Sequence, residues 1–382
     1  MIPSLLLILT VVVLRVILAA RQSRVLRSAP AAAYARALVQ QRLGAQLWQA
    51  FWALLVVVMA GWVVASASLD VRAASLFIAV AIGWLWEVPA KAWKLFRTDA
   101  SHGRNRLAAS AFLREQGGRW LLFLAVAAPA SAFTIAIFDA AGGWAWLWIW
   151  AAGWCGASLL RWVQPRYITP LFDVVEPFPE GALKTRLSAM LSRAGVSAEH
   201  LYLMRASARG AHANAQVTGD AGSPRIVLMD TLVERLSAEE IEAVVAHELG
   251  HLQRGHLRVQ LLTLGTAWLL QLALLMALTA ALPNQPLRYA AIWALFPTAG
   301  FLLQPWLNRM YRRFEFEADA AAATSSSAAA MAGALRTLTQ QNANAPKSDR
   351  WYEWVYHTHP GLAERLAALG VAPLNGHEAA SR

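Results

Sequence analysis

Charged side chains are scarce in this sequence. Aspartate, glutamate, lysine and arginine make up only 15% of its 382 residues, whereas 57% are hydrophobic. Soluble domains average about 25% charged and about 45–50% apolar residues. Several stretches of about 20 residues carry almost no charge, and that length crosses the hydrocarbon core of a bilayer. The composition therefore predicts a membrane protein, with an unusually apolar soluble protein as the alternative.

Cysteine is also nearly absent. The single cysteine, Cys155, lies within an apolar stretch, which excludes an intrachain disulfide and a metal site of the CxxC type. Acidic residues are fewer than basic ones, and the formal net charge is +11. The arginines are scattered between apolar stretches without interleaved aromatic residues, so we expect no nucleic-acid partner. A lipid bilayer accounts better for this excess of positive charge.

The hydrophobic residues are concentrated in seven runs, and each predicts a transmembrane helix. These runs cover residues 2–20, 47–69, 73–93, 119–138, 143–163, 258–282 and 288–308. We therefore expect five transmembrane helices within residues 1–163 and two more within 258–308. The polar segments 164–257 and 309–382 are predicted to form one catalytic domain that the sixth and seventh helices interrupt. The expected fold is mainly α, a polytopic membrane protein with an α+β domain.

The distribution of basic residues predicts how the chain is oriented. The segments after the first and third apolar runs are rich in arginine and lysine, and such loops face the cytoplasm. Alternation from these loops places both polar segments in the cytoplasm as well. Enrichment in alanine, arginine and tryptophan is typical of a GC-rich bacterial genome, which suggests a bacterial inner membrane.

The first polar segment contains short elements with recognisable patterns. Leu201–Met204 and Arg225–Met229 have the apolar character of strands. Ser237 followed by Glu240 is a capping box, which marks the beginning of a helix. The helix that begins there is expected to contain the segment His247-Glu248-Leu249-Gly250-His251.

This segment has the HExxH pattern of zinc metallopeptidases. The four-residue spacing puts His247 and His251 one helical turn apart on the same face, where both can bind one Zn²⁺ ion. Glu248 is then the general base for a metal-activated water. A catalytic zinc site has three protein ligands, and we expect Glu315 to be the third. Asp319, four residues later, is expected to orient a ligand histidine through its second ring nitrogen.

Two residues near this pattern have plainer interpretations. Glu315 could instead be a surface acid paired with Arg312 or Arg313. His256, five residues after His251, would lie on a different face of an ideal helix. We therefore expect His256 to have a structural or interfacial role.

Several motifs spread along the chain resemble the type I CAAX prenyl protease family, which consists of multi-span zinc metalloproteases. The resemblance rests on the following residues: Leu85-Trp86-Glu87-Val88-Pro89, His102-Gly103, Asn105, Pro170-Leu171-Phe172, Pro177-Phe178-Pro179-Glu180-Gly181, Ser207, His212-Ala213-Asn214-Ala215, Arg225-Ile226-Val227-Leu228, Asp230-Thr231-Leu232, the HExxH segment, the segment around Glu315, His359-Pro360 and Glu364-Arg365. Two positions depart from the family pattern: Gly361 replaces a proline, and Glu317 stands where glutamine is common.

The resemblance implies a seven-helix barrel around a large chamber, with zinc near its cytoplasmic end and a gluzincin-type ligand set of His247, His251 and Glu315. It further implies that His359 and Asn214 stabilise the oxyanion. Without the resemblance, both of these residues would be interpreted as structural.

Three further expectations concern residues around the site and the membrane spans. Arg365 is expected to pair with Asp319, with Glu364 as an equal alternative. Residues 211–216 are expected to form an edge strand that binds an extended substrate. Glu87, a charged residue within an apolar run, is expected to line a hydrated chamber.

The expected function is zinc-dependent cleavage of peptide bonds in a peptide or protein substrate, specifically in a prenylated C-terminal tail. Two other functions fit the same motifs. One is a broad-specificity membrane-protein quality-control protease similar to the heat-shock membrane protease HtpX. The other is a zinc-binding scaffold without catalysis, which an intact Glu248 disfavours.

Overall fold

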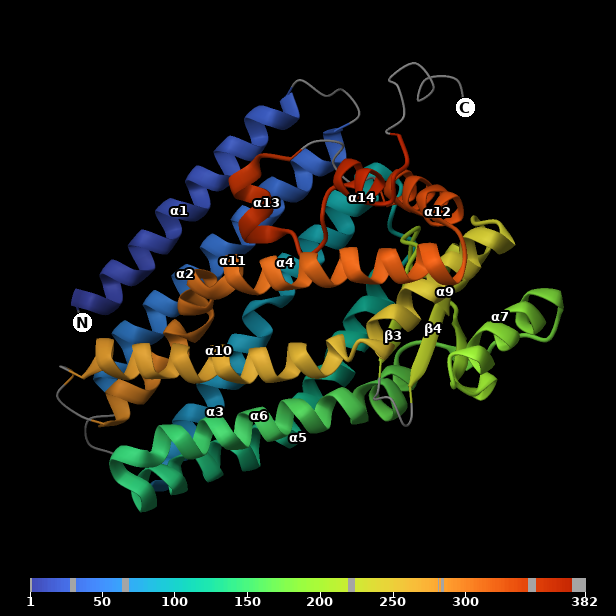
Figure 1. The fold of residues 1–382 in the computed structure, drawn as a ribbon. Coiled ribbons are helices and arrows are strands. Elements are labelled where there is room, and N and C mark those ends of the chain that lie inside the picture. The colour runs from blue at the N-terminus through green and yellow to red at the C-terminus, as the bar shows by residue number, and fades with distance from the viewer. Residues whose placement is uncertain are drawn as a thin grey trace. The chain divides into compact units, whose positions relative to one another are not determined.

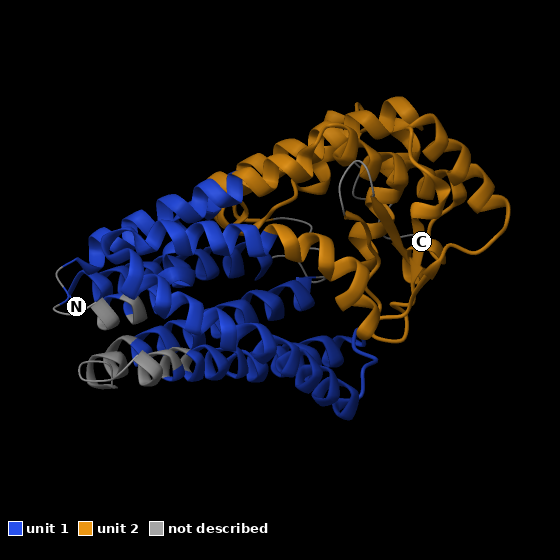
Figure 2. Cartoon of the chain, turned by 90° about the horizontal axis from the view of Figure 1, so that it is seen from below, with its two compact units in different colours: residues 1–157, 263–305 blue, residues 158–262, 306–382 orange. Residues whose placement is uncertain are grey.

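The computed structural model describes residues 2–27, 32–63, 69–218, 224–280, 282, 285–342 and 348–372. The chain divides into two compact units, which are coloured separately in Figure 2. Unit 1 comprises residues 1–157 and 263–305, and unit 2 comprises residues 158–262 and 306–382.

Unit 1 is built mainly from long helices, which are labelled in Figure 1. They are α1 (Ile2–Arg27), α2 (Ala33–Val63), α3 (Leu69–Trp86), α4 (Val88–Trp93), α5 (Ala109–Ala141), α6 (Ala145–Val163), α10 (His256–Thr279) and α11 (Gln285–Ser325), of which the last three also contribute residues to unit 2. Glu87 lies between α3 and α4, and Pro89 stands in the first turn of α4, where the missing backbone N–H is tolerated. Pro129 lies inside α5, and Pro297 and Pro305 lie inside α11.

Three stretches of the described residues are long and apolar enough to cross a membrane. They are Ile2–Arg27, Ala109–Leu171 and His256–Thr279. The second stretch contains both α5 and α6, which a turn at Gly142 with φ of 50° separates. These stretches contain the predicted runs 2–20, 119–138 and 143–163 and most of the run 258–282. The predicted run 47–69 includes residues 64–68, which lie outside the described residues.

Close contacts between tryptophans and backbone tie the helices of unit 1 together. Trp48 and Trp86 stack with ring centroids 4.2 Å apart, and each indole N–H donates to the other residue's carbonyl oxygen. Trp150 donates to the carbonyl oxygen of Gly265 at 2.7 Å. A Cβ at Gly265 would lie 2.6 Å from the indole nitrogen of Trp154, so only glycine permits this approach of α6 to α10.

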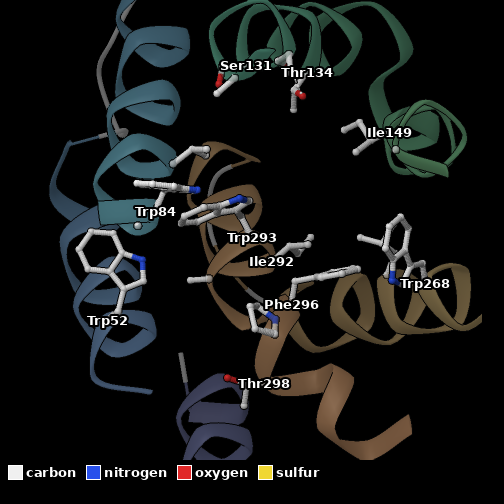
Figure 3. Close-up of a pocket in the computed structure, with 18 of the residues that line it drawn as sticks. Trp52, Trp84, Ser131, Thr134, Ile149, Trp268, Ile292, Trp293, Phe296 and Thr298 are labelled. Atoms are coloured by element: carbon white, nitrogen blue, oxygen red, sulfur yellow. Dashed lines mark hydrogen bonds between the residues drawn. The ribbon is translucent and has the colours of Figure 1, made fainter. Parts of the chain in front are cut away.

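A cavity of about 650 Å³ lies within unit 1. Figure 3 shows indole rings from four different helices at this cavity, those of Trp52, Trp84, Trp268 and Trp293. Polar groups are a minority of the lining, and Glu87 is among them. The position of Glu87 at a cavity therefore agrees with the expectation from its sequence context, although most of the lining is aromatic or aliphatic.

Unit 2 contains a small sheet with helices packed against it. Its strands are β1 (Val175–Pro177), β2 (Leu201–Met204), β3 (Ala215–Thr218) and β4 (Arg225–Met229). Their order is β1-β2-β4-β3, with β2 and β4 parallel and both outer strands antiparallel to their neighbours. The helices of this unit are α7 (Ala182–Arg193), α8 (Asp230–Val233), α9 (Ala238–Gln253), α12 (Ala328–Gln341), α13 (Arg350–Tyr356) and α14 (Leu362–Ala368).

The strands predicted at 201–204 and 225–229 and the capping box of Ser237 and Glu240 are confirmed. The strand expected over residues 211–216 is wrong in its limits, because β3 begins only at Ala215. Before it, the side chain of Asn342 exchanges two hydrogen bonds with the backbone of Ala213. A side chain therefore takes up the backbone groups of Ala213, whereas the Asn214 carbonyl oxygen still accepts a hydrogen bond from the Met229 N–H.

Asp230 fastens the loop after β2 to the end of β4. Its Oδ1 accepts hydrogen bonds from the backbone N–H groups of Ala206, Ser207 and Thr231, and its Oδ2 accepts one from the Ser207 hydroxyl. Burial opposes ionisation, but these hydrogen bonds outweigh it and lower the pKa of Asp230. The carboxylate form is thus the one that the fold stabilises.

Replacing Asp230 by alanine should destabilise unit 2 by about 1–3 kcal/mol, because its buried partners would lose their acceptor. Since the folded-state pKa is lowered, this stabilisation is present above the ordinary pKa of an aspartate and disappears as the pH falls through the folded-state value. Denaturation midpoints at several pH values would check both points. The exposed Glu234→Ala is the control, and an equal loss in both variants would contradict the assignment.

Candidate metal centre

The helix α9 carries the HExxH segment, and a capping box fixes its N-terminal end. Its first turn is closed by the reciprocal capping box of Ser237 and Glu240. Apolar residues on α9 face the core of unit 2, where the helix contacts β3 and α12. In Figure 1, α9 lies beside β3 and β4. This packing fixes the direction in which its histidines point.

A close crossing brings α9 against α11. A Cβ at Gly250 would lie 2.9 Å from the Cβ of Ala321 and 3.2 Å from the Cα of Ala318. Side chains larger than hydrogen would therefore push the two helices apart at this point. The crossing faces the HExxH turn of α9 toward the turn of α11 that carries Glu315 and Asp319.

Three ligand groups converge where these helices cross. Atoms from His247, His251 and Glu315 all lie within 4.8 Å of one another. The two Nε2 atoms are 3.1 Å apart, and the Glu315 oxygens lie 3.6 Å from His247 Nε2 and 3.4 Å from His251 Nε2. Ligands bonded to zinc at about 2.0–2.1 Å in a tetrahedron are about 3.3–3.4 Å apart. The spacing of these atoms fits a metal ion.

The burial of this group supports the same conclusion. His247, His251 and Glu315 are only 7%, 8% and 7% exposed. Among the described residues, Glu315 Oε2 is a buried side-chain oxygen with no hydrogen-bond partner, and such an atom is costly to leave unsatisfied. A metal ion would satisfy it. The surface pairing of Glu315 with Arg312 or Arg313 is therefore not what the structure shows.

Electrostatics keep Glu315 ready to act as a ligand. Burial by itself would raise the pKa of this carboxyl, but its hydrogen bond with His251 and the nearby charges of His247, His359 and Arg365 hold it well below its usual range. For His251, burial favours the neutral ring, yet the hydrogen bond and charge of Glu315 outweigh that effect and raise the pKa.

Asp319 and Arg365 hold His247 from behind. The Nδ1 of His247 lies 2.9 Å from Asp319 Oδ1, which leaves Nε2 directed at the ligand group. Arg365 donates to both carboxylate oxygens of Asp319, at 2.7 and 2.6 Å. Burial opposes ionisation of Asp319, but its bonds to Arg365 and His247 lower its pKa. The expected pair of Arg365 with Asp319 is present.

The remaining residues singled out from the sequence differ in their positions. Glu248 is half-buried on α9, and its charge raises the pKa values of both His251 and Arg365. His359 Nε2 lies 3.5 Å from Glu315 Oε1, with its side chain 64% exposed. Asn214 is exposed just before β3, and among the described residues its side chain makes no hydrogen bond with the ligand group.

His256 lies outside the ligand group, as expected, but it does not lie on the same helix as His251. The helix α9 ends at Gln253, and Gly255, with φ of 65°, redirects the chain before α10 begins. His256 therefore turns toward His251, and the two Nδ1 atoms are 3.0 Å apart. Spacing along an ideal helix could not reveal this contact, although a glycine directly before the histidine was the signal of a break.

Comparison with known proteins agrees with this geometry. The family model described as "Peptidase family M48" matches residues 177–371. The chain belongs to peptidase family M48. A second model, described as "CAAX prenyl protease N-terminal, five membrane helices", matches residues 33–174. This M48 peptidase is therefore a metal-dependent hydrolase and an integral membrane protein.

Relatives and a solved structure extend the match over most of the chain. A CAAX prenyl protease 1 homolog of Oryza sativa subsp. japonica is 31% identical over 307 residues, which are 77% of this chain and 72% of the relative. The human CAAX prenyl protease 1 homolog is 26% identical, over 72% of this chain and 69% of its own length. The crystal structure of S. mikatae Ste24p shares the fold, with a TM-score of 0.82, 22% identity, and coverage of 96% of this chain and 98% of that one.

The close crossing at Gly250 makes a specific prediction. Gly250→Ala should weaken metal binding and lower the denaturation temperature, because the added methyl group would force α9 and α11 apart. The matched control is Gly117→Ala, where a Cβ would meet nothing within 4 Å. Ala321→Gly in the Gly250→Ala background should restore part of the loss. Unchanged metal affinity in Gly250→Ala would show that the crossing does not set the ligand geometry.

Proposed function

We propose that the chain is a zinc endopeptidase in which His247, His251 and Glu315 bind the metal. The observation that carries this proposal is the convergence of their three ligand atoms around a buried, unsatisfied oxygen of Glu315. Two imidazoles and one carboxylate are a donor set typical of catalytic zinc, which keeps one position open. When bound, zinc lowers the pKa of a water molecule and polarises the scissile carbonyl group.

Glu248 is the proposed general base. It follows a ligand histidine directly on α9, is half-buried, and is close enough to influence His251 electrostatically. Its carboxylate would take the proton from the attacking water and return it to the amine nitrogen of the departing peptide. No covalent bond between enzyme and substrate is needed.

The proposed oxyanion donors are His359 and Asn214. His359 approaches the ligand group to 3.5 Å while its ring stays largely exposed, so it can donate a hydrogen bond to a bound substrate. Support for Asn214 comes from its place on the chain, since it directly precedes β3 and α9 contacts that strand.

An extended substrate would add to the edge of the sheet. Among the described residues, β3 is paired with β4 on one side only, and an open edge offers backbone groups to a peptide. Residues Ala215–Thr218 therefore take the substrate-binding role in place of the longer segment 211–216.

For the substrate class, we infer a prenylated C-terminal tail. The relatives are named for such an activity, and unit 1 contains a cavity of about 650 Å³ with a mostly apolar lining. Cavities of about 300–1,000 Å³ hold organic ligands of moderate size, and a farnesyl chain is apolar and of that order. The alternative is a quality-control protease of broad specificity.

We further infer that the metal centre faces the cytoplasm, in a bacterial inner membrane. Support comes from residues 21–46, which follow the first apolar run and carry five arginines and no acid, because cytoplasmic loops carry the excess of lysine and arginine.

Glu248→Gln tests catalysis directly. The variant should keep one zinc ion per chain and lose about 10²–10⁴-fold in kcat, since only the proton acceptor is removed. Metal analysis and peptide cleavage would be measured on the same preparation. The exposed Glu239→Gln on α9 is the control. Retention of full biological activity by a cleavage-dead Glu248→Gln protein would favour the scaffold function.

The substrate class is tested with a farnesylated peptide and its unmodified counterpart. The parent enzyme should cleave the farnesylated peptide with the lower KM. Ser131 lines the cavity, so Ser131→Phe should fill part of it and raise that KM while cleavage of the unmodified peptide stays the same. Equal cleavage of both peptides by the parent would favour broad specificity and leave the protease assignment intact.

A further inference from the structure

His256 lies directly behind the ligand His251. Its side chain is only 2% exposed, its ring centroid is 5.0 Å from that of His251, and the two Nδ1 atoms are 3.0 Å apart. At that distance the two nitrogens share one proton, because a hydrogen bond needs one donor and one acceptor. The question is which ring provides the proton.

The contact on the other side of the His256 ring identifies the proton donor. Its Nε2 lies 3.0 Å from Glu317 Oε2, and an ionised carboxylate can only accept. Arg313 donates to the second oxygen of Glu317 at 2.8 Å, which keeps this carboxylate charged. His256 must therefore carry its proton on Nε2, and its Nδ1 must be an acceptor.

The consequence reaches the ligand group. Because His256 Nδ1 accepts, His251 carries its own proton on Nδ1 and presents a bare lone pair on Nε2. That Nε2 is the atom 3.1 Å from His247 Nε2 and 3.4 Å from Glu315 Oε1. The chain of hydrogen bonds thus selects the tautomer in which His251 can bind a metal ion.

Packing holds the His256 ring in the plane that this contact requires. The ring stacks on Phe314, with centroids 4.1 Å apart and planes 8° from parallel. Phe314 is the residue before Glu315, so the same turn of α11 supplies the third ligand, the stacking partner and Glu317. His251 is supported from this turn as His247 is supported by Asp319.

We propose that His256 and Glu317 are positioning residues that fix the tautomer and orientation of His251 for metal binding. The proposal rests on the metal site of the proposed function and assigns a role to two residues outside its ligand set. Partners of this kind are worth about 10–100-fold in metal affinity when they are removed.

Two substitutions of the same residue separate positioning from packing. His256→Phe keeps a ring on Phe314 but removes the acceptor, whereas His256→Asn has a carbonyl oxygen close to the place of the Nδ1 acceptor. Zinc would be titrated into metal-stripped full-length protein in competition with a chromophoric chelator. We expect the zinc Kd to rise about 10–100-fold in His256→Phe and to stay within a few-fold of the parent in His256→Asn.

Glu317 provides a second matched pair. Glu317→Leu removes the acceptor for His256 Nε2–H and should weaken zinc binding, while Glu317→Gln can still accept through its amide oxygen. Denaturation temperatures of the metal-stripped proteins serve as the stability control. They should agree between His256→Phe and the parent, whereas the rise on adding zinc should be smaller in the variant.

The outcomes distinguish this inference from the proposed metal site. Equal zinc affinity in the parent and His256→Phe would overturn the inference and leave the site intact. The inference would also be overturned if His256→Phe and His256→Asn lost zinc affinity equally and their metal-stripped forms melted at lower temperatures. Lost packing would then explain the lower affinity of both variants. Zinc binding that survives His247→Ala unchanged would overturn the metal site, and the inference with it.

Discussion

The close crossing of α9 and α11 is the constraint on which the chemistry of unit 2 depends. Two histidines one turn apart can be placed on any helix, but a third ligand must come from a separate element. The absence of a side chain at Gly250 lets α9 approach within contact of Ala318 and Ala321. The same approach brings Glu315 to the two Nε2 atoms and Asp319 to the far side of His247. The absence of a side chain at this one glycine permits the short distance between the two parts of the proposed ligand set.

Buried charge is the second consequence of this crossing. Asp319 and Arg365 are 1% and 8% exposed, and removing one partner of such a pair costs about 3–5 kcal/mol because it leaves the other unpaired. This cost belongs to the partner that is left unpaired and does not measure a net gain in stability from the pair. What the pair does is fix the geometry around His247. Arg365 on α14 joins α11 through Asp319, and Asp319 in turn sets the ring of His247. A segment remote in sequence is in this way coupled to the proposed metal ligands.

Unit 1 meets a different physical requirement. A bilayer cannot solvate an indole N–H group, and several tryptophans of unit 1 donate theirs to backbone carbonyl oxygens of other helices. The reciprocal hydrogen bonds of Trp48 and Trp86 and the bond from Trp150 to Gly265 are examples. Tryptophans also line part of the cavity, so the same residue type joins the helices and contributes to the apolar cavity surface.

The sequence by itself determined the features that depend on local spacing. Neighbouring residues decide the spacing of the HExxH segment, the capping box before it and two short strands. The hydrophobic runs likewise follow from the order of apolar residues along the chain. Only the tertiary structure decided that β3 begins at Ala215. The side chain of Asn342, more than a hundred residues away, binds the backbone N–H and C=O groups of Ala213 before this strand. It also decided the role of His256, since a positive φ at Gly255 ends the helix whose periodicity had placed that ring elsewhere. Local patterns specify helices, whereas contacts between helices depend on where each one ends and how closely the next can approach.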